Sequence, residues 1–366
     1  FLPISRLSKT GLYVWGYNSN GQVGNGVTGS SPSSPYIVGG AGSYTWRQVS
    51  VGNKTTAAIK TDGTLWAWGY NYNGALGNST TTDTASPIQV GTDANWRQVA
   101  VGWRSSWSAF VLAIRNDGTL WGWGENGDGS LGIGNTISYS SPVQIGSLNN
   151  WKALYTNQSD SAVAAIKTDG TLWTWGNNSS GQLGNGASTQ YSSPIQVGSL
   201  NGWRSASVGN GWMGAIRNDG TLWMWGQGGS GNLGNGSFGT YYSPIQIGTL
   251  TNWKTLSCGY NCNFAIKNDG TLWSWGTDSQ GALANGTTGT YNSPVQIGAQ
   301  SNWKQAACGY GVSFMLKTNG TLWACGYTGF GQLGYVNGSD KYSSPIQIGS
   351  LSSWKSIAPA GGGTMA

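Results

Sequence analysis

Gly-Thr-Leu-Trp-Ala-Trp-Gly, residues 63–69, is the stretch that decides the fold, because close copies of it recur along the whole chain. Five copies keep the pattern Gly-Thr-Leu-Trp-x-Trp-Gly, and degenerate copies stand near both ends. The residue before the closing glycine falls at positions 15, 68, 123, 175, 225, 275 and 325. A unit that recurs about every 50 residues cannot bury its apolar face alone, so neighbouring units must pack against each other.

Each unit carries four short strand signals. The first begins at a Trp-Arg or Trp-Lys pair, as at residues 96–102, and the second is of the type Ala-Ile-Lys, as at residues 57–60. An Asp-Gly turn, a strong hairpin signal, leads into the third strand at residues 64–68. After a Gly/Asn-rich loop, the fourth strand starts at a proline, which suits an outer edge. We therefore predict an all-β fold, a seven-bladed β-propeller with four antiparallel strands in each blade.

The two ends of the chain are complementary. The chain opens with a third and a fourth strand signal, at residues 12–15 and 35–38, and closes with a first strand at residues 354–358 and the beginning of a second at residues 364–366. These segments predict a ring closed by a blade shared between the N- and C-termini, built from about residues 1–40 plus 354–366. We expect one propeller domain over residues 1–366, either processed at its start or part of a longer polypeptide.

Composition supports a packed fold. The 366 residues include 62 glycines, and charged residues make up only 8%, which alone could indicate disorder. The 22 tryptophans recur at fixed places and supply a large apolar surface. No run of 18 apolar residues exists, so we expect no membrane span. One set of tryptophans, on the third strands, is predicted to fill the space between blades: Trp66, Trp121, Trp173, Trp223, Trp273 and Trp323.

The net charge of +6 could indicate nucleic-acid binding, but most bases occupy repeat positions. One set follows the first-strand tryptophan: Arg47, Arg97, Lys152, Arg204, Lys254, Lys304 and Lys355. A second set ends the second strand: Lys60, Arg115, Lys167, Arg217, Lys267 and Lys317. We interpret both sets as solvated strand edges, and no nucleic acid is favoured as a partner.

Four cysteines lie in the last third of the chain, at Cys258, Cys262, Cys308 and Cys325. Because the chain has no histidine, a zinc site would need all four thiolates. Buried free thiols are the favoured interpretation, and one disulfide stays open as an alternative. We expect no metal and no cofactor.

The sequence shows no catalytic constellation. Without histidine, the commonest general base is missing. Glu125 and Asp128 are close acids outside the repeat positions, and they could bind calcium through oxygen atoms, although a solvated loop is the favoured interpretation. We predict no catalytic residues and no enzyme.

The motif Trp-Gly-x-Asn-x-x-Gly-Gln-Leu-Gly-x-Gly, seen at residues 175–186, resembles the regulator of chromosome condensation repeat. The resemblance covers essentially the whole chain and implies a seven-bladed propeller. Members of that family include a nucleotide exchange factor that also binds nucleosomes, chromatin and ubiquitin-ligase modules, a secreted β-lactamase inhibitor, and bacterial or phage surface proteins. Dense Thr/Ser/Asn/Gly loops and scarce charge make this chain closest in character to the bacterial or phage surface members.

Binding sites on propellers usually come from loops that depart from the repeat. The segment from Trp96 to Ile114 is longer than its counterparts, and its aromatics and arginine have the composition of an interaction hot spot. An insertion that folds back over the ring is the alternative. With the equivalent aromatics of other units, the candidate binding residues are Trp103, Arg104, Trp107, Phe110, Trp212, Tyr260 and Tyr310.

Three hypotheses of function follow. The first is a non-catalytic, extracellular or virion-surface propeller that serves as a display or attachment module, with other proteins of a larger assembly or a surface glycan as partners. The second is a guanine-nucleotide exchange or chromatin-type regulator. The third is a secreted enzyme inhibitor. The sequence favours the first.

Overall fold

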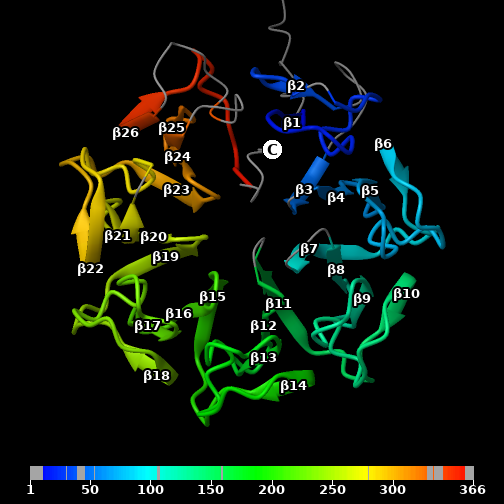
Figure 1. The fold of residues 1–366 in the computed structure, drawn as a ribbon, viewed down its shortest axis with the longest axis horizontal. Coiled ribbons are helices and arrows are strands. Elements are labelled where there is room, and N and C mark those ends of the chain that lie inside the picture. The colour runs from blue at the N-terminus through cyan, green and yellow to red at the C-terminus, as the bar shows by residue number, and fades with distance from the viewer. Residues whose placement is uncertain are drawn as a thin grey trace, which may run out of the picture.

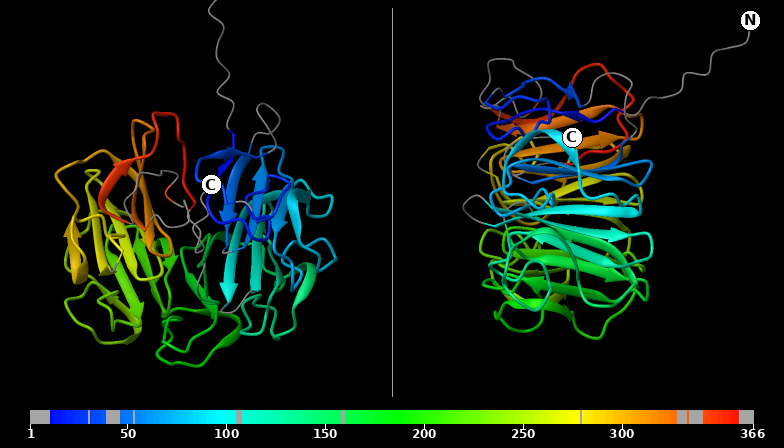
Figure 2. Two further views of the ribbon diagram at one scale, coloured as in Figure 1. Left: turned by 45° about the horizontal axis from the view of Figure 1, so that its top comes forward. Right: turned by 90° about the vertical axis from the view of Figure 1, so that its right-hand side faces the viewer.

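The structure is a computed structural model that describes residues 11–29, 31–38, 46–52, 54–104, 108–157, 160–278, 280–327, 333 and 341–358. These residues form 26 strands arranged as radial sheets around a central axis (Figure 1). Seen from the side, the sheets stand along this axis and follow one another around it (Figure 2). The described residues contain no helix that could cross a membrane.

Six of the sheets are four-stranded blades whose strands follow chain order from the axis to the rim. The first, innermost strands are β3 (Trp46–Val51), β7 (Trp96–Arg104), β11 (Trp151–Thr156), β15 (Trp203–Val208), β19 (Trp253–Cys258) and β23 (Trp303–Cys308). The second strands are β4 (Thr55–Lys60), β8 (Ser108–Arg115), β12 (Val163–Lys167), β16 (Trp212–Arg217), β20 (Cys262–Lys267) and β24 (Val312–Lys317).

The outer half of each blade consists of the third and fourth strands. The third strands are β5 (Leu65–Gly69), β9 (Leu120–Gly124), β13 (Leu172–Gly176), β17 (Leu222–Gly226), β21 (Leu272–Asp278) and β25 (Leu322–Tyr327). The fourth strands are β6 (Thr84–Gln89), β10 (Tyr139–Gln144), β14 (Tyr191–Gln196), β18 (Tyr241–Gln246), β22 (Gly289–Gln296) and β26 (Lys341–Gln347). All neighbours within a blade are antiparallel, which confirms the all-β propeller with four antiparallel strands per blade.

The prediction of seven such blades is wrong in its count, because the structure has six. The remaining sheet has two strands, β1 (Tyr13–Val14) and β2 (Tyr36–Ile37). The first strand expected at residues 354–358 is not a strand, and the second strand, expected at residues 364–366, lies outside the described residues. A strand needs a ladder of backbone partners, and no such ladder to residues 354–358 exists among the described residues.

Residues 354–358 nevertheless lie beside the N-terminal sheet. The ring of Trp354 is 5.2 Å from that of Tyr13 and 6.1 Å from that of Trp15, measured between centroids. On its other side, the segment exchanges two hydrogen bonds with the sixth blade, from Gln305 Nε2 to Ile357 O and from Ile357 N to Gln305 Oε1. The two ends of the propeller are thus in contact, although they do not build a four-stranded blade.

The most deeply buried tryptophans are not the predicted third-strand set. That set is only partly buried, whereas in five of the six blades the tryptophan two residues further along the third strand is fully buried (Trp68, Trp123, Trp175, Trp225 and Trp275). Each of these five donates its indole N–H to a loop carbonyl of the preceding unit, as Trp175 Nε1 does to Ser130 O at 2.8 Å and Trp68 Nε1 does to Gln22 O at 2.9 Å. They therefore join neighbouring blades through both apolar packing and a buried hydrogen bond.

The partly buried third-strand tryptophans support the bases that end the second strands. The ammonium nitrogen of Lys60 lies 3.4 Å from the centroid of the Trp66 ring, and that of Lys167 lies 3.5 Å from the Trp173 ring. Five of the six bases in that set make this cation–π contact. This set of bases therefore belongs to the framework of the blades.

One glycine per blade faces the buried tryptophan closely. At Gly234, which has φ +71°, an added Cβ would lie 2.8 Å from the indole nitrogen of Trp275. In the next blade, alanine replaces this glycine at Ala284, with φ 62°, and Cys325 replaces the facing tryptophan. The Cys325 thiol donates to Ala282 O at 3.5 Å, the carbonyl that corresponds to the acceptor of the Trp275 indole. The smaller side chain makes room for the extra methyl group.

All four cysteines are free and buried, as the favoured interpretation predicts. Burial raises the pKa of the Cys258 thiol to about 12. Burial also raises the pKa values of Cys308 and Cys325 well above the ordinary value. These thiols therefore stay protonated, and they are poor nucleophiles and metal ligands.

Candidate protein-binding face

The loops that connect first to second strands, and third to fourth strands, lie at the same end of each blade. We call this end the loop face, and the opposite end, with the Asp-Gly hairpins, the turn face. Backbone hydrogen bonds tie the two kinds of loop together, such as Tyr70 N to Lys54 O at 2.8 Å and Glu125 N to Ala109 O at 2.9 Å. The loop face is thus a fixed platform on which side chains of different blades can act together.

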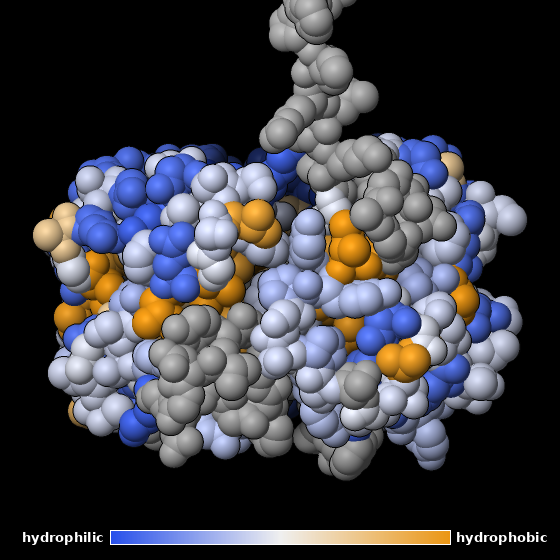
Figure 3. All heavy atoms as spheres, turned by 90° about the horizontal axis from the view of Figure 1, so that it is seen from above, coloured by the Kyte–Doolittle hydropathy of each residue, from blue (hydrophilic) through white to orange (hydrophobic). Residues whose placement is uncertain are grey.

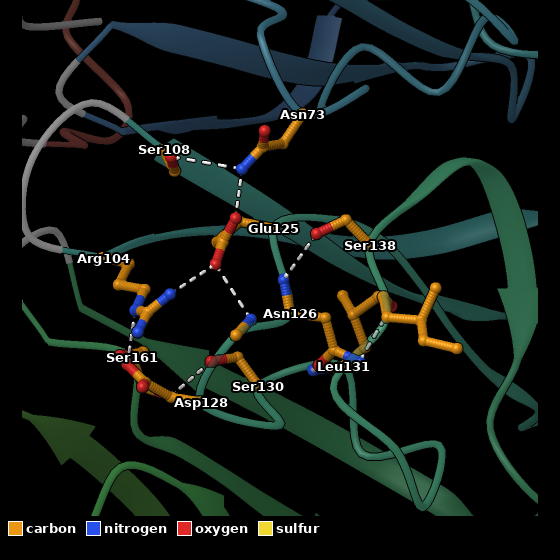
Figure 4. A network of polar contacts seen from close by, with 12 residues as sticks. Asn73, Arg104, Ser108, Glu125, Asn126, Asp128, Ser130, Leu131, Ser138 and Ser161 are labelled. Carbon is orange, nitrogen blue, oxygen red and sulfur yellow. Dashed lines mark hydrogen bonds and ion pairs between the residues drawn. The ribbon is translucent and has the colours of Figure 1, made fainter.

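An ion-pair network dominates the loop face of the second blade (Figure 4). Arg104 Nη1 lies 2.8 Å from Glu125 Oε1, and Arg104 Nε lies 2.9 Å from Asp128 Oδ2. Glu125 also accepts hydrogen bonds from Gly127 N, at 2.8 Å, and from Asn73 of the first blade. Burial lowers the pKa of Arg104, but the hydrogen bonds and charges of the two acids outweigh this effect and raise it.

This network changes how the acid pair is interpreted. Glu125 and Asp128 were expected in a solvated loop, with calcium binding as the alternative, and instead both hold Arg104. In the described part of the chain, no group of three or more acids or cysteines is arranged to hold a metal ion. All three residues were singled out from the sequence, but their pairing was not predicted, because it depends on how far the hairpin of β7 and β8 extends.

Three of the predicted aromatics lie around the mouth of the central channel on the loop face. The channel has a volume of about 1010 Å³, and Trp103, Tyr260 and Tyr310 are among its lining residues. The rings of Tyr260 and Tyr310 meet edge to face, with centroids 4.6 Å apart. Tyr310 is 57% exposed, whereas Trp103, on β7, is buried in the cluster formed by the first and second blades. Tyr310 is therefore the aromatic of this group that is most available to a partner.

Besides Trp103, two more of the predicted binding aromatics are buried in the core. The extra residues of the second blade lengthen the hairpin, since β7 runs to Arg104 and β8 begins at Ser108. Strand alternation then turns Phe110 inward, where it is fully buried. Trp212 is buried at the start of β16, and its indole N–H donates to Asn263 Oδ1 at 2.8 Å. Trp107 lies outside the described residues.

A tyrosine pair on the first blade was missed. The rings of Tyr70 and Tyr72 are stacked, with an interplanar angle of 10° and centroids 6.3 Å apart. Tyr72 is 66% exposed, and the ammonium group of Lys54 lies 5.7 Å from the Tyr70 ring. The signal was the alternation Tyr-x-Tyr directly after the repeat Trp-Gly, which no other unit carries.

A buried carboxylate braces the loop face between the third and fourth blades. Asp160 accepts hydrogen bonds from Asn177 Nδ2 at 3.0 Å, from Gln182 Nε2 at 2.8 Å and from Gly211 N at 3.0 Å. Burial raises the pKa of Asp160, while these donors act in the opposite direction. Every bond is local to the loops, so we assign this residue a structural role.

The side of the ring above β1 and β26 is mostly hydrophilic, with apolar residues in scattered small groups (Figure 3). This view gives no extended apolar patch of the kind that marks a large permanent interface. This side of the ring therefore shows no apolar patch to compare with the exposed tyrosines and the charged network of the loop face.

The profile of the RCC1-like domain matches residues 6–315, most of the chain. The chain belongs to the RCC1-like domain family. Its sequence is 30% identical over 202 residues to the human E3 ubiquitin-protein ligase HERC2, a match that covers 55% of this chain and 4% of the ligase. It is 31% identical over 200 residues to the ultraviolet-B receptor UVR8 of Arabidopsis thaliana, covering 54% of this chain and 44% of the receptor.

The RCC1-like fold is also found by structural comparison. Prp20p from Saccharomyces cerevisiae, described with its binding to Gsp1p and histones, superposes with a TM-score of 0.83 and 18% identity. The superposition covers 97% of this chain and 90% of that of Prp20p. At this identity the likeness shows the fold alone.

These relatives correct three predictions. A ubiquitin ligase and an ultraviolet-B receptor do not support a bacterial or phage surface character, and they contradict the display or attachment function. Because ubiquitin is a protein of the cell interior, the ligase also conflicts with an extracellular or virion-surface location. No relative supports a glycan partner, whereas protein partners agree with the family.

The prediction of no enzyme is corrected as well, because the matched family includes a ubiquitin-protein ligase. The matched part is a small fraction of the length of that ligase, and less than half of that of UVR8. The activity of the whole ligase is therefore not assigned to this chain.

Proposed function

We propose that this chain is the protein-binding propeller of a regulatory protein, and that a protein partner docks on its loop face. The observation that carries the proposal is the gathering of exposed tyrosines and a charged network at this end of the ring. Tyr72 and Tyr310 are exposed on the loop face, and tyrosine supplies contact area with little loss of conformational entropy. Arg104, held by two acids, adds a polar contact of fixed direction.

The form of regulation that we propose is guanine-nucleotide exchange on a small GTPase, with a chromatin-type regulator as the second candidate. Prp20p, whose fold this chain shares, binds both Gsp1p and histones, and these two proteins are therefore the first partners to test. A rigid ring suits exchange, because a factor that holds a nucleotide-free GTPase must not lose its binding energy in reorganising itself.

The test measures release of a fluorescent GDP analogue from Gsp1p after addition of the purified chain and excess GTP. We expect release to accelerate, and Tyr310→Ser to weaken this effect about tenfold, as is typical of an aromatic hot spot. Leu250→Ser is the matched control, because Leu250 is a 45% exposed apolar residue in a fourth-to-first-strand connection, on the turn face. In parallel, binding to immobilised histones is measured by biolayer interferometry.

The outcomes separate the candidates. Faster GDP release that depends on Tyr310 supports exchange. Histone binding that depends on Tyr310, without any effect on GDP release, supports the chromatin-type regulator. If neither protein binds, or if Leu250→Ser weakens binding as much as Tyr310→Ser, the proposed function and its docking face are wrong.

A further inference from the structure

The bases that follow the first-strand tryptophans stand apart from the framework bases. We call them the basic ring: Arg47, Arg97, Lys152, Arg204, Lys254, Lys304 and Lys355. In all six complete blades, the register between the first and second strands shifts at this residue, which is the sign of a β-bulge. A bulged residue leaves the ladder and its side chain is turned in a new direction. Because the bulge recurs in all six blades, the changed direction of the basic side chain is a regular feature of the blade.

The bulge directs the basic side chains around the central axis. Arg97 Nη2 donates to Trp151 O of the next blade at 2.6 Å, and Arg204 Nη2 donates to Trp253 O at 2.7 Å. Lys304 Nζ donates in the same way to Lys355 O at 2.8 Å. These acceptors are neutral carbonyl groups, so the bonds hold the side chains in place without removing their charge. The first strands are the innermost strands of the ring (Figure 1), and Arg204 and Lys254 of the basic ring are among the residues that line the central channel.

No described carboxylate neutralises the basic ring. The ion pairs of the described residues involve Arg104, Arg115 and Arg217, none of which belongs to it. The lining of the channel includes Arg204 and Lys254 and contains no Asp or Glu. Like charges that converge on one mouth, without counter-charges, create a focused positive potential there.

An outer set of acids surrounds this positive centre on the same face. Asp62, Asp117, Asp169, Asp219 and Asp269 are exposed in the hairpins between second and third strands. These hairpins adjoin the start of the next first strand, as the bond from Trp96 N to Gly63 O at 3.1 Å shows. Each of these acids stands two residues after a base that ends a second strand, and Arg217 Nη1 lies 3.2 Å from Asp219 Oδ2. The outer zone of the turn face therefore carries charges of both signs, whereas a compact anion on the axis would meet only bases.

We propose that the channel mouth on the turn face binds a compact multivalent phosphate, of the oligophosphate class. Several bases on the innermost strands around one axis can contact such an anion at the same time, with lysines acting as point charges and arginines as directed donors. Hydroxyl groups behind the ring, on Ser205, Ser207 and Thr255, line the channel and offer further hydrogen bonds. The site lies opposite the loop face and does not depend on the proposed function.

The test is isothermal titration calorimetry with inorganic tripolyphosphate at low salt. Lys254→Gln should raise the Kd about fivefold, and the double change Lys152→Gln/Lys254→Gln about twentyfold, because each removes one unscreened charge from the site. Lys254→Arg keeps the charge and should bind as the wild type does. Lys341→Gln is the control, since it lowers the net charge equally on the rim strand β26. All variants are first compared with the wild type in thermal stability.

Three results would overturn the proposal. One is a Kd that the double change leaves as it was. Another is equal weakening by Lys341→Gln and Lys254→Gln, which would mean attraction by net charge alone. The third is tighter binding of duplex DNA or of an oligoglutamate peptide, lost in the same variants, which would assign the site to a different anion. Tripolyphosphate binding that falls only in the basic-ring glutamine variants, and weakens steeply with NaCl, supports the site.

Discussion

Exchange of Gly234 for alanine tests how tightly the blades are joined. Two costs add at this position. Holding alanine at φ +71° costs about 1 kcal/mol. The new Cβ would lie 2.8 Å from the indole nitrogen of Trp275, and such overpacking costs about 1–3 kcal/mol. Because the indole also donates to Asn232 O at 2.9 Å, it cannot move away without losing that bond. We expect Gly234→Ala to lower the free energy of unfolding by about 2–4 kcal/mol.

The sixth blade supplies the compensating change. Trp275→Cys copies Cys325, and alone it should cost about 3–5 kcal/mol by leaving a cavity. In the double variant Gly234→Ala/Trp275→Cys the clash is gone, so the total cost should fall short of the sum by about 1–3 kcal/mol. Urea unfolding followed by far-UV circular dichroism measures the free energy of unfolding of the wild type, the two single variants and the double variant. Costs that add to within about 0.5 kcal/mol would refute the idea that the two positions are coupled.

Hydrogen bonds from the turn threonine lower the pKa of Asp62, so its contribution to stability is present above the unfolded pKa of about 3.9 and is lost as the pH falls through the lower folded pKa. Asp62→Asn copies Asn319 of the sixth blade, and it should leave the Tm at pH 7 nearly unchanged while weakening the loss of stability in acid. Asp160→Asn should lower the free energy of unfolding by about 1–3 kcal/mol. The reason is that an amide N–H would face the N–H groups that donate hydrogen bonds to the carboxylate. Burial raises the pKa of Asp160 in the folded protein, so the wild type should lose stability relative to this variant as the pH rises through that folded pKa. A difference in Tm between the two proteins that stays constant with pH would contradict this sign. Glu125→Gln should cost about 0.5–1 kcal/mol by weakening the pair with Arg104, and 1 M NaCl should narrow the difference in Tm from the wild type.

The sequence predicted the blades because their signals are local. Strand alternation and the Asp-Gly turns place Trp66 and Trp68 on one strand, but they do not say which side faces the neighbouring blade. That choice depends on packing between units, and it makes Trp68 the deeper residue. The predicted number of blades was wrong for a related reason. Trp354 carries the sequence signal of a first strand, but whether a strand forms depends on backbone partners, and residues 354–358 are not a strand.

The candidate site was harder to predict, because it depends on how far strands extend. A segment longer than its counterparts was interpreted as a loop, and the structure uses it to lengthen β7 and β8. This change buries Phe110 and brings Arg104 within reach of Glu125. The basic ring was interpreted as a solvated edge because a β-bulge leaves no mark in the pattern of apolar and polar residues.

The buried thiols have a practical consequence. All four cysteines lie in the fifth and sixth complete blades, on β19, β20, β23 and β25. Cys325 is 0% exposed, so a maleimide reagent can reach it only when that sector opens. Its labelling rate therefore measures local opening events that global unfolding curves would average away. Mass spectrometry of the modified peptides could then follow, with no engineered probe, how a distant ligand tightens or loosens one third of the complete blades.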